Sequence, residues 1–103
     1  MVRMHQRWEV TYGKFADFMN NLEEVNAVLR DRGWPEFVAW APTSGKPNEV
    51  VLISDYPDFA TYKQQEAAAY ADSEFMKAWR RGAEFVVQGS GFVELLEPAP
   101  RLA

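Results

Sequence analysis

Hydrophobic residues recur with two different periods in the first third of the chain. Residues 3–11 alternate between apolar and polar side chains, which predicts a strand with Trp8 on its apolar side. Residues 14–32 carry apolar side chains at three- and four-residue steps, which predicts an amphipathic helix. Gly33 follows as a candidate left-handed cap, and Pro35 prevents the helix from continuing.

The rest of the chain contains three further predicted strands and one long, interrupted helix. The strands are expected over 36–41, 49–56 and 92–97. The helix begins after Asp58, its candidate N-cap, and ends before the turn at 89–91. Its apolar pattern is interrupted at 71–73, where Asp72 can cap a new helical start. We therefore predict a break in this helix within a residue or two of Asp72.

The order of these elements, β-α-β-β-α-β, predicts an α+β fold of the ferredoxin-like sandwich type when the crossovers are right-handed. One domain is expected over residues 1–97, followed by a C-terminal tail over 98–103. The strands at 3–11 and 49–56 are expected at the centre of the sheet, parallel to each other, with the other two strands at its edges.

The strand at 49–56 indicates how the protein assembles. Residues 50–53 are Val-Val-Leu-Ile without a polar break, so both faces of this strand are expected to be apolar. Two helices can cover only one face of a four-stranded sheet. We expect a second copy of the chain to cover the other face, which gives a homodimer.

Composition excludes several classes of protein. The net charge is −4, and no basic tract is longer than the Arg80-Arg81 pair, so we expect no nucleic-acid partner. The absence of cysteine excludes disulfides, thiolate nucleophiles and cysteine-based metal sites. The chain shows no signal peptide and no apolar run long enough to span a membrane, so a cytoplasmic protein without a membrane partner is expected.

Aromatic residues make up 15% of the chain and include four Trp, which indicates a ligand cavity or an interface, or simply a well-filled small core. The candidate ligand pocket lies between the sheet and the broken helix. Its expected residues are Trp8, Tyr62, Glu66, Tyr70, Phe75 and Trp79. A carboxylate on the inward side of the helix, such as Glu66, is a candidate acid or base with a raised pKa, or else a solvated residue at the edge of the apolar stripe.

His5 is the single histidine, and it lies on the polar side of the first strand. It is a candidate general base or metal ligand, or a hydrogen-bonding residue at the subunit contact. One His offers too few ligands for a metal, so we expect neither a metal nor a cofactor. The charged residues on the same side are Arg3, Arg7 and Glu9. They are expected to pair with one another or with Asp55 or Glu97, or to bind an anionic ligand inside the dimer.

Two segments carry a resemblance to a known family. The strand-to-helix join at 50–59 and the broken helix ending at 75–81 resemble the dimeric α/β-barrel superfamily, and within it the NIPSNAP-like proteins and the antibiotic biosynthesis monooxygenases. The resemblance spans nearly the whole chain, and it implies two sheets facing each other across a dimer with the helices outside. It also implies that aromatic or polyketide-like molecules bind between helices and sheet.

The monooxygenase relatives are associated with Asn, Trp and Arg acting without a cofactor on a substrate that itself activates oxygen. The residues of these types near the predicted pocket are Asn20, Asn21, Trp79 and Arg80. Haem-degrading relatives place a His on or beside a helix, whereas His5 lies in a strand, which argues against haem chemistry.

Three functions are compatible with these observations, and whether the protein is an enzyme stays open among them. The first is a NIPSNAP-like dimer that binds a small apolar or aromatic molecule between helices and sheet. The second is a cofactor-independent monooxygenase or isomerase acting on an aromatic or polyketide-like substrate. The third is a non-catalytic dimeric interaction module whose pocket is filled by its own aromatic side chains.

Overall fold

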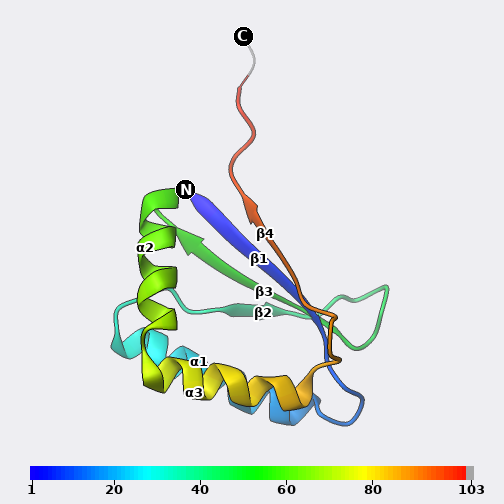
Figure 1. Cartoon of the computed structure of the whole chain (residues 1–103). Coiled ribbons are helices and arrows are strands. Elements are labelled where there is room, and N and C mark those ends of the chain that lie inside the picture. The colour runs from blue at the N-terminus through cyan, green and yellow to red at the C-terminus, as the bar shows by residue number, and fades with distance from the viewer. Residues whose placement is uncertain (102–103) are drawn as a thin grey trace.

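A four-stranded sheet forms one layer of the molecule (Figure 1). The computed structural model describes residues 1–101. The strands are β1 (Val2–Glu9), β2 (Val38–Trp40), β3 (Glu49–Tyr56) and β4 (Phe92–Leu96). Their order across the sheet is β2-β3-β1-β4, with β1 and β3 at the centre, as the ferredoxin-like prediction requires.

The prediction that β1 and β3 run parallel was wrong, because all three pairs of neighbouring strands are antiparallel. The connections explain the difference. The crossover through the first helix makes β1 and β2 parallel to each other, and a hairpin then turns the chain back into β3. Because β3 is antiparallel to β2 and β1 is parallel to β2, β3 is antiparallel to β1 as well.

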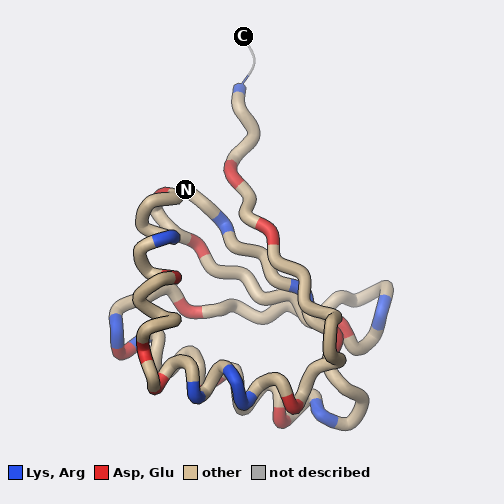
Figure 2. The backbone as a smooth tube through the Cα atoms, in the orientation of Figure 1, with Lys and Arg blue, Asp and Glu red and all other residues tan. Residues whose placement is uncertain are grey.

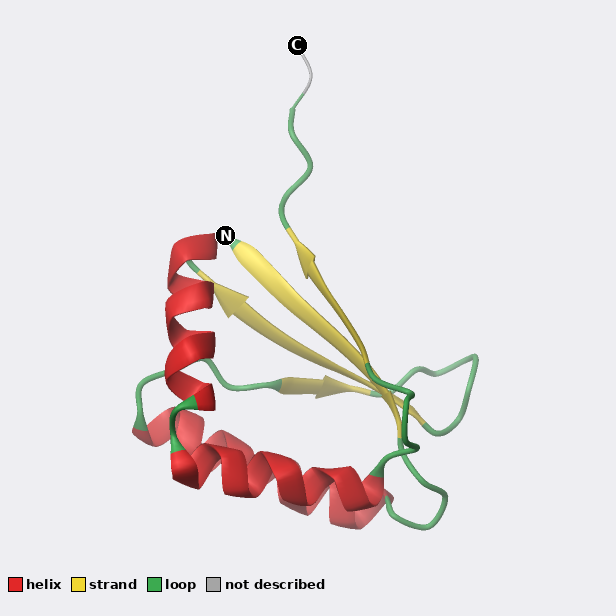
Figure 3. Ribbon diagram, in the orientation of Figure 1, coloured by secondary structure: helices red, strands yellow, loops and turns green. Residues whose placement is uncertain are grey.

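The helices lie together on one side of the sheet (Figure 3). They are α1 (Phe15–Asp31), α2 (Phe59–Tyr70), α3 (Ser73–Arg81) and a short 3₁₀ helix, η1 (Gly82–Phe85). The predicted N-cap at Asp58 is confirmed, since its side chain accepts a hydrogen bond from the Thr61 N–H at 2.7 Å. The predicted helix break is also confirmed: Asp72 caps α3 and accepts from the Phe75 N–H at 3.0 Å.

The last helical segment ends earlier than its apolar pattern predicted, at Arg81 rather than just before residue 89. The backbone beyond η1 bonds to the end of β1 instead of to its own helix. The Thr11 N–H donates to the Phe85 carbonyl at 2.9 Å, and the Val87 N–H donates to the Glu9 carbonyl at 2.8 Å. A helix through these residues would lose both of these bonds to β1.

The core lies between the sheet and the helices. Even-numbered residues of β1 and β3 face the helices, and Val50 and Leu52 are each only 2% exposed. On the helical side, Val25 of α1 and Phe75 of α3 are buried against them. The inward-facing side chains of the strands and the apolar side chains of α1 therefore pack in one cluster, as the sequence pattern predicts.

Odd-numbered residues of β1 and β3 form the opposite surface, which we call the outer face. Its apolar residues are Val38, Trp40, Val51, Ile53, Phe92 and Leu96. Its arginines are paired within the chain: Arg3 donates two hydrogen bonds of 2.8 and 3.0 Å to Asp55, as predicted, and Arg7 lies 3.3 Å from Glu49. Glu9 pairs with Lys46, and no pair with Glu97 occurs among residues 1–101.

The chain beyond β4 runs away from the sheet (Figure 1). The tail predicted over 98–103 is described as far as Arg101, and the last two residues lie outside the described part of the chain. Within residues 1–101, no helix combines the length and the apolar composition that a membrane crossing needs.

Candidate functional site

Two cavities lie between the helices and the sheet, one on each side of Trp79. The Glu66 cavity is lined mainly by residues of β1 and α2, together with residues of α3 and of the end of α1 and the loop that follows it. Its volume is about 70 Å³. The Arg80 cavity is lined by residues of β1, α1 and the α3–η1 segment around Arg80, and its volume is about 640 Å³. Trp79 lines both.

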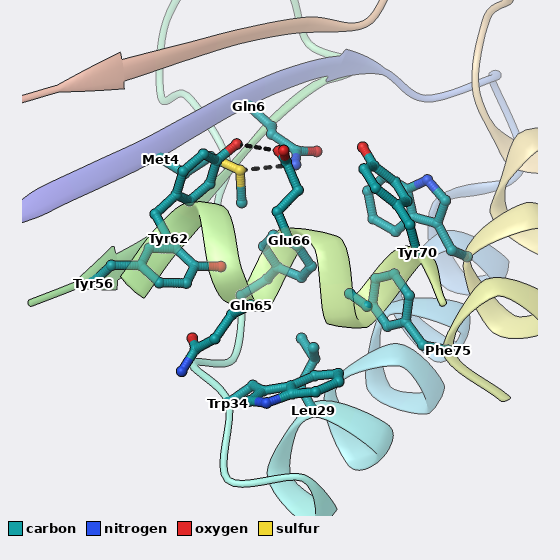
Figure 4. A pocket seen from close by; sticks show the side chains of 13 residues that line it. Met4, Gln6, Leu29, Trp34, Tyr56, Tyr62, Gln65, Glu66, Tyr70 and Phe75 are labelled. Atoms are coloured by element: carbon teal, nitrogen blue, oxygen red, sulfur yellow. Dashed lines mark hydrogen bonds between the residues drawn. The ribbon is translucent and has the colours of Figure 1, made fainter. Parts of the chain in front are cut away.

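Five of the six predicted pocket residues line the Glu66 cavity: Tyr62, Glu66, Tyr70, Phe75 and Trp79. The sixth, Trp8, lines the Arg80 cavity instead. Figure 4 shows Tyr62, Glu66 and Tyr70 projecting from α2 toward Gln6 of β1. The helical spacing of the α2 residues brings them onto one side of the helix, which is the reason that the sequence could group them.

Glu66 is held by two hydrogen bonds. The Tyr62 hydroxyl donates to Glu66 Oε2 at 2.5 Å, and Lys63 Nζ donates to Glu66 Oε1 at 3.0 Å. The Tyr62 bond is the main cause that lowers the pKa of Glu66, which corrects the expectation of a raised value. Burial, followed by the bond to Glu66, raises the pKa of Tyr62. At neutral pH Glu66 is therefore an ionised acceptor and Tyr62 a protonated donor, and neither is poised for proton transfer.

Gln6 supplies a polar group that the sequence analysis did not select. It is 6% exposed, and the Trp8 indole N–H donates to its Oε1 at 2.9 Å. This bond orients the amide so that Nε2 lies 3.5 Å from the Met4 sulfur, a weak acceptor. The available signal was a glutamine on the apolar side of a strand, between Met4 and Trp8, where burial requires hydrogen-bond partners.

The two cavities differ in what they can hold. A volume of about 70 Å³ holds only a few water molecules, so an aromatic ring enters the Glu66 cavity only if its walls move. Tyr70, at its rim, is 63% exposed and is the most exposed of the residues that line this cavity. The Arg80 cavity, at about 640 Å³, falls in the range of roughly 300–1,000 Å³ found for small-molecule sites.

The walls of the Arg80 cavity are mainly apolar. Phe18, Leu22 and Val25 line it from α1, and Leu52 lines it from β3. Its polar side chains are Asn21, Arg80 and Gln88. The Asn21 amide donates to the Ala78 carbonyl at 2.9 Å, which ties α1 to α3 and fixes the amide in the wall.

Three of the four candidate residues, namely Asn21, Trp79 and Arg80, thus come together in this cavity, and they include all three residue types associated with the monooxygenase relatives. Asn20 is exposed on α1 and lines neither cavity.

Trp79 forms the partition between the two cavities. Its ring stacks on Phe75, with ring centres 6.0 Å apart, and on Phe37 at 5.8 Å. It meets Trp8 edge to face at 6.4 Å. Trp79 is therefore a wall residue and a packed residue at the same time, and the two alternatives weighed from the sequence are not exclusive.

Two glycines allow side chains that line the Arg80 cavity to lie close to the backbone. A Cβ atom added at Gly91 would lie 2.5 Å from Cζ3 of Trp8, and one added at Gly82 would lie 2.7 Å from Oδ1 of Asn21. Both distances are shorter than real Cβ contacts. The sequence identified the turn at 89–91, but nothing in it indicated which ring packs against Gly91.

His5 lies on the outer face, on the opposite side of the sheet from both cavities. Its Nδ1 is 3.4 Å from Glu94 Oε1. Within residues 1–101, no three His, Asp or Glu side chains are grouped as a metal site requires.

The antiparallel sheet with helices on one side defines the chain as a ferredoxin-like α+β domain with cavities between its two layers. The NIPSNAP family model matches residues 5–99, and the chain belongs to the NIPSNAP family.

Solved structures share the fold at low identity. A NIPSNAP domain protein from Burkholderia xenovorans is 19% identical with a TM-score of 0.81, covering 100% of this chain and 99% of its own. A NIPSNAP family protein from Agrobacterium tumefaciens is 11% identical with a TM-score of 0.78, covering 95% and 92%. An antibiotic biosynthesis monooxygenase is 15% identical with a TM-score of 0.73, covering 97% and 100%. No curated protein matches this chain.

Proposed function

We propose that this NIPSNAP protein binds a small, mostly apolar molecule with a flat aromatic part between its helices and its sheet. The observation that carries the proposal is the Arg80 cavity, whose volume of about 640 Å³ suits a small-molecule site. Trp8 and Trp79 line this space, and aromatic walls suit a flat aromatic ligand. The Glu66 cavity is too small to accept the same ligand without movement of its walls.

The test uses naphthamide, an uncharged flat aromatic, and follows quenching of tryptophan fluorescence. Wild-type protein should bind it with saturation. Ala83 is exposed and lines the cavity, so Ala83→Phe should place a ring in part of the space and weaken binding. Ala27→Phe, at an exposed position of α1 that lines neither cavity, is the matched control and should bind as wild type does. Equal binding by both variants would contradict the proposal.

A cofactor-independent monooxygenase or isomerase is the second candidate function. It is favoured by the grouping of Asn21, Trp79 and Arg80 around one cavity. Oxygen uptake on addition of a hydroxyaromatic, reduced in Ala83→Phe, would establish the monooxygenase, and conversion of an enolisable substrate without oxygen uptake would establish the isomerase. If the compound binds and is recovered unchanged, the protein binds its ligand without catalysing a reaction on it. The open volume of the Arg80 cavity weighs against the interaction module, which needs a pocket filled by its own side chains.

We also propose that the functional unit is a homodimer joined through the outer face. Trp40 is 60% exposed and Phe92 53% exposed on this surface, while helices cover only the opposite side of the sheet. The two arginines of the outer face already have acidic partners within the chain, so a second copy can cover them without leaving an unpaired cation.

A further inference from the structure

We propose that the ligand of the Arg80 cavity is an amphipathic carboxylate: a flat apolar body that carries one carboxylate group, bound by the Arg80 guanidinium. This inference rests on the proposed function, because it names the chemical class of the molecule that occupies the same cavity. It is carried by the ion-pair pattern of the chain and by the composition of the cavity wall.

Among residues 1–101, Arg80 has no acidic partner, although the sequence has acids in excess. The sequence has 15 acidic and 11 basic residues, and eight of the basic residues have a carboxylate within 4.0 Å among residues 1–101. Its neighbour Arg81 pairs with Glu24 at 2.7 Å. The basic residues without such a partner are Lys77, Arg80 and Arg101. Of these three, Arg80 alone lines a cavity.

Among the described residues that line its cavity, Arg80 is also the single charged one. Figure 2 shows the basic residues of α3 in blue along the helix that bounds the site. The acidic residue closest to Arg80 in sequence on the same segment is Glu84, four positions further on, and it makes no ion pair with Arg80. An anion at the cavity mouth therefore meets one cation and no competing carboxylate in the wall.

The other side chains of the wall indicate what the rest of the ligand is like. Behind Arg80 lie the rings of Trp8 and Trp79 and the aliphatic side chains of α1, so the part of the molecule inside the cavity is apolar. One guanidinium offers a planar pair of N–H donors that matches one carboxylate in charge and geometry. A phosphate dianion would keep one of its two negative charges unpaired, because the wall contains no second cation among the described residues.

The test compares naphthoate with its uncharged amide, naphthamide, on three forms of the protein. On wild type, naphthoate should bind about tenfold more tightly than naphthamide, a difference of about 1.4 kcal/mol. In Arg80→Gln the preference for naphthoate should be lost, so that the two compounds bind with equal affinity. Arg81→Gln makes the same change in net charge at the adjacent residue, which lines neither cavity, and should keep the tenfold preference.

Other results separate the two proposals. Equal binding of both compounds by wild type, or equal loss of naphthoate binding in Arg80→Gln and Arg81→Gln, overturns the role of Arg80 and leaves the aromatic site in place. Failure of wild type to bind either compound overturns the proposed function together with this inference. Arg80 is exposed and unpaired, so Arg80→Gln should melt at the wild-type temperature, which excludes misfolding as a cause.

Discussion

Trp79 joins packing and function in one side chain, because its ring stacks on Phe37 and Phe75 and also separates the two cavities. Trp79→Ala should lower the free energy of unfolding by about 3–5 kcal/mol, since it removes a large, partly buried ring. Trp79→Phe keeps a ring between the same partners and should cost roughly half as much or less. Urea denaturation measures both. A cost below about 1 kcal/mol for Trp79→Ala would show that the ring is a wall residue without a packing role.

Gly91 gives Trp8 the room that it occupies, so a methyl group at this position should displace the indole ring. We expect Gly91→Ala to destabilise the protein by about 1–3 kcal/mol and to change the tryptophan emission. Trp8→Phe removes the ring atoms that would clash, so in the double variant the second substitution should cost much less. A double-mutant cycle measures this coupling, and strictly additive effects would contradict the predicted contact.

Much of the candidate site was predictable from residue spacing, and the rest was not, for physical reasons. Tyr62, Glu66 and Tyr70 share one side of a helix, so periodicity alone groups them. The pKa of Glu66 was predicted in the wrong direction, because it depends on a hydroxyl oriented toward the carboxylate at 2.5 Å. Arg80 was noted only for its residue type, since its lack of a partner depends on where every carboxylate of the fold lies.

The junction between α2 and α3 depends on Asp72, whose side chain caps α3. Asp72 also accepts a hydrogen bond from Arg32 Nε at 2.8 Å, and this bond links the end of α1 to the junction. The Phe75 N–H bond and then the Arg32 bond lower the pKa of Asp72. Asp72→Asn keeps an oxygen for the cap but loses the charge, and it should lower the thermal midpoint at pH 7 by roughly 5 °C.

The pH dependence of this effect has a definite sign. Because the pKa of Asp72 is lowered on folding, its contribution is complete above the unfolded value of about 3.9 and is lost as the pH falls through the lower folded value. Thermal melts of wild type and Asp72→Asn should therefore converge below about pH 4. A difference that stays constant down to pH 2 would show that the carboxylate charge does not stabilise the junction.

Local sequence predicts where the helices begin and break better than it predicts the features that depend on contacts between distant elements. The cap at Asp58 and the break at Asp72 were predicted because each depends on a side chain acting within three residues of itself. The early end of α3 was missed because it depends on bonds between residues 85–87 and the end of β1, far away in the sequence. The strand orientation, in contrast, follows from the order of the elements: the crossover makes β1 and β2 parallel, and the hairpin makes β3 antiparallel to both.

The whole molecule exposes more surface than its mass requires. The accessible surface is 6856 Å², against about 5,900 Å² for a compact monomer of this mass. The outer face and the tail that runs away from the sheet contribute to this excess. Burial of the outer face against a second copy would also bring two sheets together and leave the cavities of each subunit on the helical sides, away from the contact.

A charge on the outer face should therefore split the dimer. Val51 lies near the centre of this face, and an unpaired carboxylate buried there costs more than the apolar contact that it replaces. We expect wild type to scatter light with the mass of two chains at micromolar concentration, and Val51→Asp to scatter with the mass of one.

Two further valines form a matched pair that separates the effect of position from the effect of charge. Val38 is 54% exposed on the outer face, and Val93 is 51% exposed on the opposite side of the sheet. Val38→Asp should weaken the dimer, whereas Val93→Asp should leave its mass unchanged, although both remove a similarly exposed side chain and add the same charge. A monomeric wild type, or equal dissociation by both variants, would place the contact elsewhere than on the outer face.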